Sequence, residues 1–224
     1  MTELDALDSL LRQRHSCRGF LDRAVPDETI VRIVETAGRA PSWCNSQPWQ
    51  VIVTRAAETE ALRAELLAGA ADTEGGKPDM PFPSGYSGLH QQRRRTCGWQ
   101  LYEAVGVQKG DRAGSTKQAL ENFRLFGAPH TAILTSGDEL GPYGAMDCGG
   151  FILAFCLAAQ ALGVATVPQA AVASQAPMLR ERFAIPEDRM ILCAISFGYE
   201  DTEHPANGFR TNRAPLAEIL DLRG

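Results

Sequence analysis

The chain of 224 residues is long enough to bury one substantial core, and its 44% hydrophobic and 22% charged content is typical of a globular protein. The net charge of −5 gives no reason to expect nucleic acid or an anionic membrane as a partner. Six cysteines without a C-x-x-C pair, and four histidines without ligand spacing, argue against disulfides and against a metal site. The acidic N-terminus lacks the apolar core of a signal peptide, so we expect a cytoplasmic protein.

Helical and strand patterns alternate along the whole chain. Leucines at helical spacing predict a first helix over residues 3–13, and Pro26 with two following acids opens a second helix that Pro41 ends. A β-branched strand is expected at residues 49–54. Further helices are expected over 56–69, 95–105, 117–126, 147–162, 174–183 and 214–222, and further strands over 131–135, 164–168 and 190–197. Strands separated by helices predict a central sheet with helices on both faces.

Two stretches depart from this pattern within what we expect to be a single domain, residues 1–224. Residues 149–167 are nearly free of charge and about long enough to span a bilayer. Gln160 and Gly163 interrupt the stretch, so we interpret it as a buried central helix followed by a strand. Residues 72–115 are rich in glycine, proline and charge, which predicts a lid or a substrate loop inserted into the domain.

Three polar clusters are the candidate site. The segment Arg14-His15-Ser16-Cys17-Arg18 carries guanidinium, imidazole and hydroxyl donors without a carboxylate, a set that suits a phosphate. Alone it would be a solvated basic turn, but a polar loop at residues 40–49 and a basic cluster at 210–213 accompany it. The first cluster follows the C-terminal end of a helix, so side chains rather than the helix dipole would bind the anion. No P-loop and no G-x-G-x-x-G motif occurs, and we expect any catalysis to depend on an organic cofactor.

In order and spacing these clusters resemble the FMN-dependent nitroreductase family. Arg14-His15-Ser16-x-Arg18 matches the family's R-[RH]-S-x-[RK], and Ala40-Pro41-Ser42-x-x-Asn45-x-Gln47-Pro48-Trp49 matches its A-P-S-x-x-N-x-Q-P-W loop. Residues 93–98 and 122–129 are similar to a bacterial branch that includes nitrobenzoate and nitrophenol reductases. The resemblance implies an α+β, nitroreductase-like fold, with a mostly antiparallel or mixed sheet flanked by helices. It also implies a homodimer packed through the long helix, with FMN at the subunit interface.

The resemblance also assigns roles to single residues. It implies the cofactor-binding set Arg14, His15, Ser16, Arg18, Pro41, Ser42, Trp43, Asn45, Gln47, Asn122, Pro168, Gln169, Ala170, Arg210 and Arg213. Arg14, Ser16 and Arg213 would bind the phosphate, with Arg210 as a further candidate donor. The 41–45 loop would come from the other subunit. Arg18 would lie where negative charge collects on the reduced ring, and Ala170 would offer its backbone N–H to N5. These two are the catalytic candidates.

The implied activity is that of an FMN-dependent NAD(P)H oxidoreductase. It would reduce nitroaromatics or quinones by ping-pong two-electron transfer, with Trp43 and Phe126 as candidates to line an aromatic slot. Reductive dehalogenation on the same fold and a non-catalytic flavin-binding or storage module stay open as alternatives. The run Arg93-Arg94-Arg95 is expected to be a solvated or partner-facing patch, or to hold an acidic group of a substrate or of NADPH.

Overall fold

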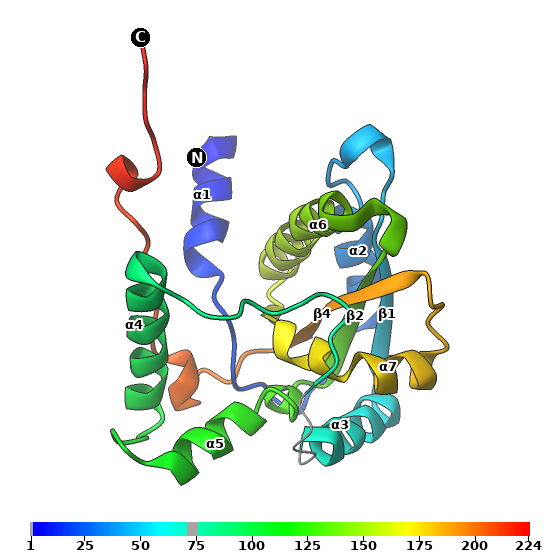
Figure 1. Cartoon of the computed structure of the whole chain (residues 1–224), viewed down its shortest axis with the longest axis horizontal. Coiled ribbons are helices and arrows are strands. Elements are labelled where there is room, and N and C mark those ends of the chain that lie inside the picture. Colours follow the sequence, from blue (N-terminus) through cyan, green and yellow to red (C-terminus); the bar gives the residue numbers. More distant parts are fainter. Residues whose placement is uncertain (1, 71–75) are drawn as a thin grey trace.

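A four-stranded antiparallel sheet between two layers of helices forms the body of the molecule (Figure 1). The computed structural model describes residues 2–70 and 76–224. The helices are α1 Glu3–Gln13, α2 Asp27–Ala37, α3 Ala57–Ala70, α4 Gly88–Ala104, α5 Arg112–Leu120, α6 Gly141–Ala161 and α7 Ala176–Phe183. The strands are β1 Gln50–Arg55, β2 His130–Gly137, β3 Ala165–Gln169 and β4 Arg189–Gly198. The expected α+β class is confirmed.

The sheet places β3 at one edge, and the candidate site is built on that edge. The strand order is β1-β2-β4-β3, and every pair is antiparallel. The central strands β2 and β4 are buried almost throughout, because helices cover both of their faces. On the outer side of β3, Ser16 forms an isolated parallel bridge with Thr166. The basic segment found in the sequence therefore covers the free edge of the sheet.

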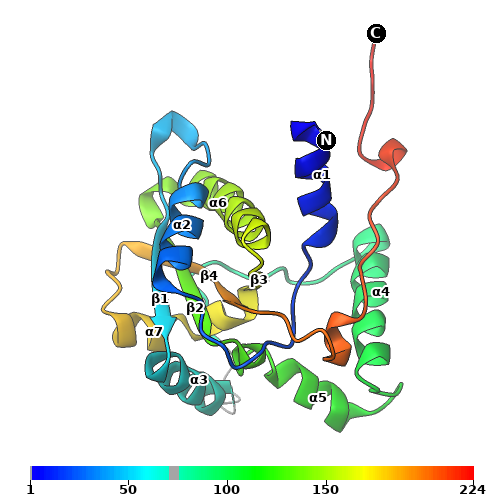
Figure 2. The ribbon, with the colours of Figure 1, turned by 180° about the vertical axis from the view of Figure 1, so that it is seen from behind.

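Each face of the sheet has its own apolar core. Helices α2 and α6 cover one face, where Phe151, Phe155 and Phe197 are buried together. Helices α3 and α7 cover the other face, with Leu66 and Leu179 fully buried. Figure 2 shows both layers from behind, with α4, α5 and the C-terminal segment lying outside them. The cores thus support the sheet, and the peripheral elements are left to shape the site.

Helix α6 is the longest element, and its two sides differ. Its length and composition would suffice to cross a membrane, but a core helix passes the same test. Phe151 and Phe155 pack against the sheet, whereas Met146 and Leu153 on the other side are 69% and 47% exposed. Gly163, with φ of +72°, ends the helical segment as the sequence predicts. Half of α6 is therefore core, and half is an uncovered apolar surface.

Three expected elements differ from the structure. The tail 214–222 is not an α-helix: the chain forms only a short 3-10 turn at Leu216–Glu218, and its leucines stay exposed, so no apolar packing supports a longer helix. The helix expected over 117–126 lies earlier, at α5, and 3-10 turns follow it. The helix expected over 95–105 begins at Gly88, so much of the 72–115 insertion is helical, although residues 72–75 lie outside the described residues.

The two-layer core predicts a matched pair of effects on α2. Ile33 is fully buried and Val31 is 55% exposed on the same helix. Ile33→Ala should lower the free energy of unfolding by about 2 to 5 kcal/mol, because it leaves a cavity under the helix. Val31→Ala should change it by less than about 0.5 kcal/mol. Urea denaturation followed by circular dichroism measures both, and equal losses would contradict the assignment of the α2 core face.

Candidate active site

A pocket of about 920 Å³ gathers the arginines from both ends of the chain. Arg14, Arg18, Arg210 and Arg213 all line it, together with His15 and Ser16. The one carboxylate in its lining, Asp8, is paired with Arg12 on the same helix. Among the described residues, none of the other four guanidiniums has a carboxylate partner. The pocket is therefore a cluster of uncompensated positive charge, which suits a dianion such as a phosphate monoester.

Contacts with the edge of the sheet hold the basic segment in place. The backbone N–H of Cys17 donates to the Thr166 carbonyl at 3.0 Å, next to the Ser16 bridge. The His15 ring lies 3.0 Å from a Glu200 carboxylate oxygen, so this imidazole is engaged in the fold. Strand β3 and the residues after β4 thus fix the direction in which the arginines of this segment point.

Arg18 is the cation with the most unusual surroundings. Its guanidinium donates to the Ser16 carbonyl at 3.2 Å and lies 5.9 Å from the ring centroids of both Phe126 and Phe209. Burial lowers the pKa of this guanidinium below its usual value. A partly desolvated cation without a counter-ion gains much from an anionic ligand, since the local dielectric is low.

The end of β3 exposes small side chains, but none of Asn122, Pro168, Gln169 and Ala170 lines the arginine pocket. Pro168 and Ala170 are exposed, whereas the side chain of Gln169 between them is buried. Gln169 donates to the Asn122 carbonyl at 2.8 Å and accepts from the Ser196 hydroxyl. Ala170 begins a 3-10 turn, so its N–H has no partner within that turn. Gln169 therefore holds Asn122 next to a strand end that offers a backbone donor.

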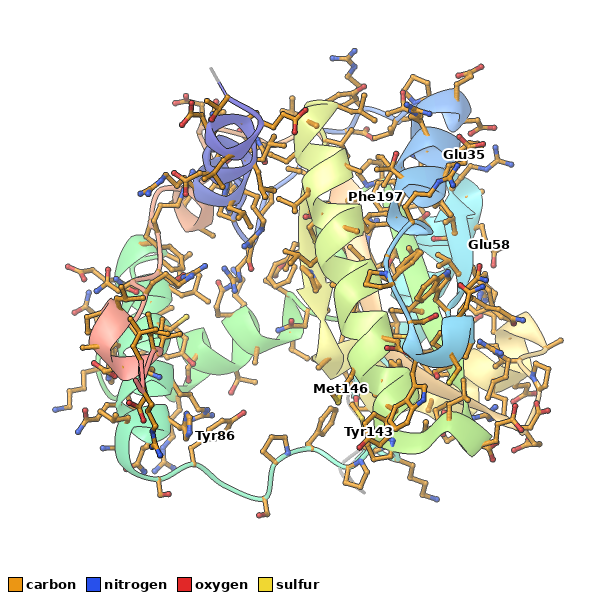
Figure 3. The ribbon with its side chains drawn as sticks, turned by 90° about the horizontal axis from the view of Figure 1, so that it is seen from above. Glu35, Glu58, Tyr86, Tyr143, Met146 and Phe197 are labelled. Atoms are coloured by element: carbon orange, nitrogen blue, oxygen red, sulfur yellow. The ribbon has the colours of Figure 1, made fainter. Side chains whose placement is uncertain are left out.

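The loop at residues 41–49 lies away from this pocket within one chain. The Trp43 N–H donates to Asp147 at 3.0 Å, and its ring packs edge-on against Tyr143 with centroids 4.1 Å apart. Both partners belong to the N-terminal third of α6, where Figure 3 labels Tyr143. The arginine pocket instead contains Ser16, which bridges to Thr166 of β3, the strand that follows the end of that helix. None of Pro41, Ser42, Trp43, Asn45 or Gln47 lines the arginine pocket.

This loop is nevertheless a fixed structure. The Ser42 hydroxyl accepts from the Gln47 backbone N–H at 2.9 Å and closes the loop. Cys44, Asn45 and Gln47 all adopt positive φ, at +50°, +57° and +47°. Backbone strain of this kind in residues other than glycine is typical of functional loops. The loop thus presents its polar groups in one conformation, on a surface that the rest of the chain leaves open.

Sequence reasoning missed Asn207, which supports the site, and several residues that line the pocket, of which Phe209 lies against Arg18. Asn207 is 4% exposed and accepts from the Arg18 backbone N–H at 2.7 Å. Its local sequence, an Asn before a Gly, is typical of a turn and predicts no contact with a residue 189 positions away. Phe209 shows no periodic pattern either, because it lies in an irregular segment. Only the tertiary structure reveals either contact.

The thiol within the basic segment is not a reactive group. Burial raises the pKa of the Cys17 thiol to about 12, so it stays protonated at neutral pH. All six cysteines lie within the described residues, and none forms a disulfide. Across residues 2–70 and 76–224, no three His, Cys, Asp or Glu side chains are grouped so that they could hold a metal ion. The arginine pocket remains the candidate site.

Known proteins match this chain over nearly its whole length. A model described as "Nitroreductase family" matches residues 11–199. Nitroreductase NfnB of Mycolicibacterium smegmatis is 36% identical over 95% of this chain and 91% of that protein. A 4-nitrobenzoate reductase of a Nocardioides strain is 34% identical over 95% of this chain and 88% of its own length.

Solved structures of similar fold also belong to nitroreductases. The FMN-dependent nitroreductase NfnB from Mycobacterium smegmatis in complex with NADPH superposes with a TM-score of 0.94, at 33% identity and full coverage of both chains. An FMN- and NADPH-dependent NfnB from Sphingopyxis sp. strain HMH gives 0.92 at 31% identity, over 97% of this chain and 98% of that one. The match of sequence motifs, fold and sequence identity leads to one conclusion: this chain belongs to the nitroreductase family.

Proposed function

We propose that this protein is an FMN-dependent NAD(P)H oxidoreductase that reduces nitroaromatic compounds or quinones. The observation that carries the proposal is the group of four arginines without carboxylate partners in one pocket, on a chain that belongs to the nitroreductase family. Both solved relatives described above are FMN-dependent by name, and one was crystallised with NADPH. We therefore favour NADPH as the electron donor.

The donors present fit FMN. Arg14, Ser16, Arg210 and Arg213 would hold the phosphate, because they place hydroxyl and guanidinium donors around one pocket. Their charge matches a phosphate dianion rather than a neutral ligand. Asn122 and the free N–H of Ala170 lie beside β3 and would bind polar atoms at the edge of the ring. Pro168 would face the ring with a small apolar surface that does not hinder stacking.

Arg18 has a separate role. FMN, when bound, accepts a hydride equivalent from NAD(P)H and delivers two electrons to the acceptor. Arg18 would stabilise the negative charge that reduction leaves on the ring, since its partly buried guanidinium has no other counter-ion in the described chain. The protein thus supplies binding, orientation and a fixed charge, and Arg18 is its principal catalytic residue.

The active unit is a homodimer, and the uncovered apolar surfaces support this. On α6, Met146 and Leu153 are exposed, and on α1 Leu4 is 73% exposed. The C-terminal segment, which runs away from the body in Figures 1 and 2, exposes Leu216 and Leu222 at 68% and 84%. Apolar surface on this scale favours a protein partner. A second copy would bring its own 41–49 loop to the arginine pocket, to which the loop of the same chain contributes no residue. We place the enzyme in the cytoplasm.

Substrate choice would reside in the insertion. Helix α4 contributes Cys97 to the wall of the arginine pocket, and Arg94 lies over the Tyr86 ring at 5.4 Å. Arg93 pairs with Glu218, so this arginine joins α4 to the C-terminal segment. The segment 76–115 therefore reaches the site from outside the core, where residues can change without cost to the fold.

Anaerobic mixing tests the activity. FMN-loaded protein should lose its visible flavin absorbance on addition of NADPH and regain it when 4-nitrobenzoate or a quinone is added, because electrons pass through the bound cofactor. Buffer without the electron acceptor is the control for reoxidation. Colour that persists with both NADPH and NADH would favour the storage module, and reoxidation by a halogenated aromatic with halide release would favour dehalogenation.

The phosphate assignment predicts the effect of removing one guanidinium. Arg213→Ala should weaken FMN binding roughly 10- to 100-fold, since a charge-assisted hydrogen bond is lost. Arg223→Ala is a matched control, because this arginine lies in the same terminal segment and pairs with Asp221 outside the pocket. Fluorescence titration of the apoprotein with FMN measures both variants, and equal affinities for FMN would contradict the assignment.

The dimer predicts a change of molecular mass. Leu153→Arg should yield monomers with little bound FMN, because a charge would be buried in the interface and the partner's loop would be lost. Ala64→Arg places the same charge on α3, across the sheet from α6, and should leave a dimer. Light scattering coupled to gel filtration separates these outcomes. A Leu153→Arg variant that stays a fully FMN-loaded dimer would contradict the interface.

A further inference from the structure

One buried amide holds the backbone at Arg18. The Asn207 side-chain oxygen accepts from the Arg18 N–H at 2.7 Å. Its nitrogen donates to the carbonyls of Gly19 and Asp201, each at 2.9 Å. All three partners are main-chain atoms, and they belong to segments that are far apart in the sequence. Because the side chain is almost fully buried, its loss would leave the Arg18 N–H without a partner in the described chain, whereas the Gly19 and Asp201 carbonyls keep backbone donors from Asp201 and His204.

The same segment also holds the Arg18 guanidinium. Phe209, two residues after Asn207, lines the arginine pocket with Arg18. Phe126 lines a neighbouring cavity of about 670 Å³, and Arg18 lines that cavity as well. With the guanidinium 5.9 Å from both ring centroids, the two rings flank the boundary between the cavities. Cation–π contacts of this kind favour one position of the charge.

The 201–209 segment packs closely against the backbone at Gly19, next to Arg18. A Cβ added at Gly19 would come within 2.2 Å of the His204 ring, which is part of the same 201–209 segment. In addition, Arg210 donates to the Asn207 carbonyl at 2.7 Å. Asn207 therefore lies between a phosphate-pocket arginine on one side and Arg18 on the other.

We propose that Asn207 is a positioning residue that fixes Arg18 and links it to the phosphate-binding arginines. This rests on the proposed function, and it assigns a task to a residue outside the recognised motifs. Because the charge of Arg18 matters most when the ring carries negative charge, displacing it weakens the binding of reduced FMN more than that of oxidised FMN. Asn207 thereby raises the reduction potential of the bound cofactor.

The reduction potential of bound FMN tests this, together with FMN affinity. Asn207→Ala should weaken binding of oxidised FMN about tenfold, and that of reduced FMN about tenfold more. The second tenfold lowers the two-electron potential of the bound cofactor by about 30 mV. Thr202→Ala replaces an exposed polar side chain of the 201–209 segment and should leave the potential unchanged. A merely structural role for Asn207 would lower the melting temperature without moving the potential.

A double-mutant cycle shows whether Asn207 acts through Arg18. In an Arg18→Met background at saturating FMN, Asn207→Ala should no longer shift the potential, because the charge it positions is gone. Phe209→Leu provides a second route if Asn207→Ala does not fold, since it removes one aromatic face and keeps the Asn207 hydrogen bonds. This variant should also lower the potential.

An unchanged potential in Asn207→Ala, or in Phe209→Leu where that variant carries the test, would overturn the inference and leave the proposed function intact. An equal shift in the Arg18→Met background would also overturn it. Failure of the unmodified protein to bind FMN would overturn the proposed function, and the inference with it.

Discussion

Mutual repulsion among guanidinium groups is the constraint around which this molecule is built. Arg14, Arg18, Arg210 and Arg213 share one pocket, and the described chain provides no carboxylate to neutralise them. Holding such charges together in a partly desolvated space is unfavourable unless an anion joins them. Backbone contacts hold the arginines in place against this repulsion: Ser16 bridges to the β3 edge, and the buried Asn207 amide accepts from the Arg18 N–H. This arrangement is the one expected of a site that binds a phosphorylated ligand.

A single chain also leaves several apolar surfaces exposed to solvent. Helix α1 has no buried residue, although its leucines lie on one face. Half of α6 and the tail beyond Pro215 are equally uncovered. The strained 41–49 loop contributes no residue to the arginine pocket of its own chain. These features have a common explanation if two chains complete each other, so that cofactor binding and subunit association depend on the same contacts.

The sequence was informative where the determinants are local. Apolar periodicity located α1 and α2 and all four strands, and Gly163 marked the end of α6. It predicted only the second half of α4, because the arginine- and glutamine-rich first half shows no apolar face. It failed at residues 214–222, where leucine and isoleucine suggested a helix but, in the described chain, these side chains stay exposed and bury no apolar face. The hydrogen bond from the Arg18 N–H to Asn207 joins residues 189 positions apart, and no local sequence pattern predicts such a contact.

The bridge between Ser16 and Thr166 has a consequence for the protein without its ligand. An unprotected edge strand offers free N–H and C=O groups to any other strand and is a route to aggregation. Here the segment that shields β3 is also the one that carries Arg14 and Arg18. If the repelling arginines lift this segment when no phosphate is present, the strand edge becomes open to other molecules. FMN binding would then protect the protein against self-association. The supply of FMN during synthesis would decide what fraction of the protein reaches the native state.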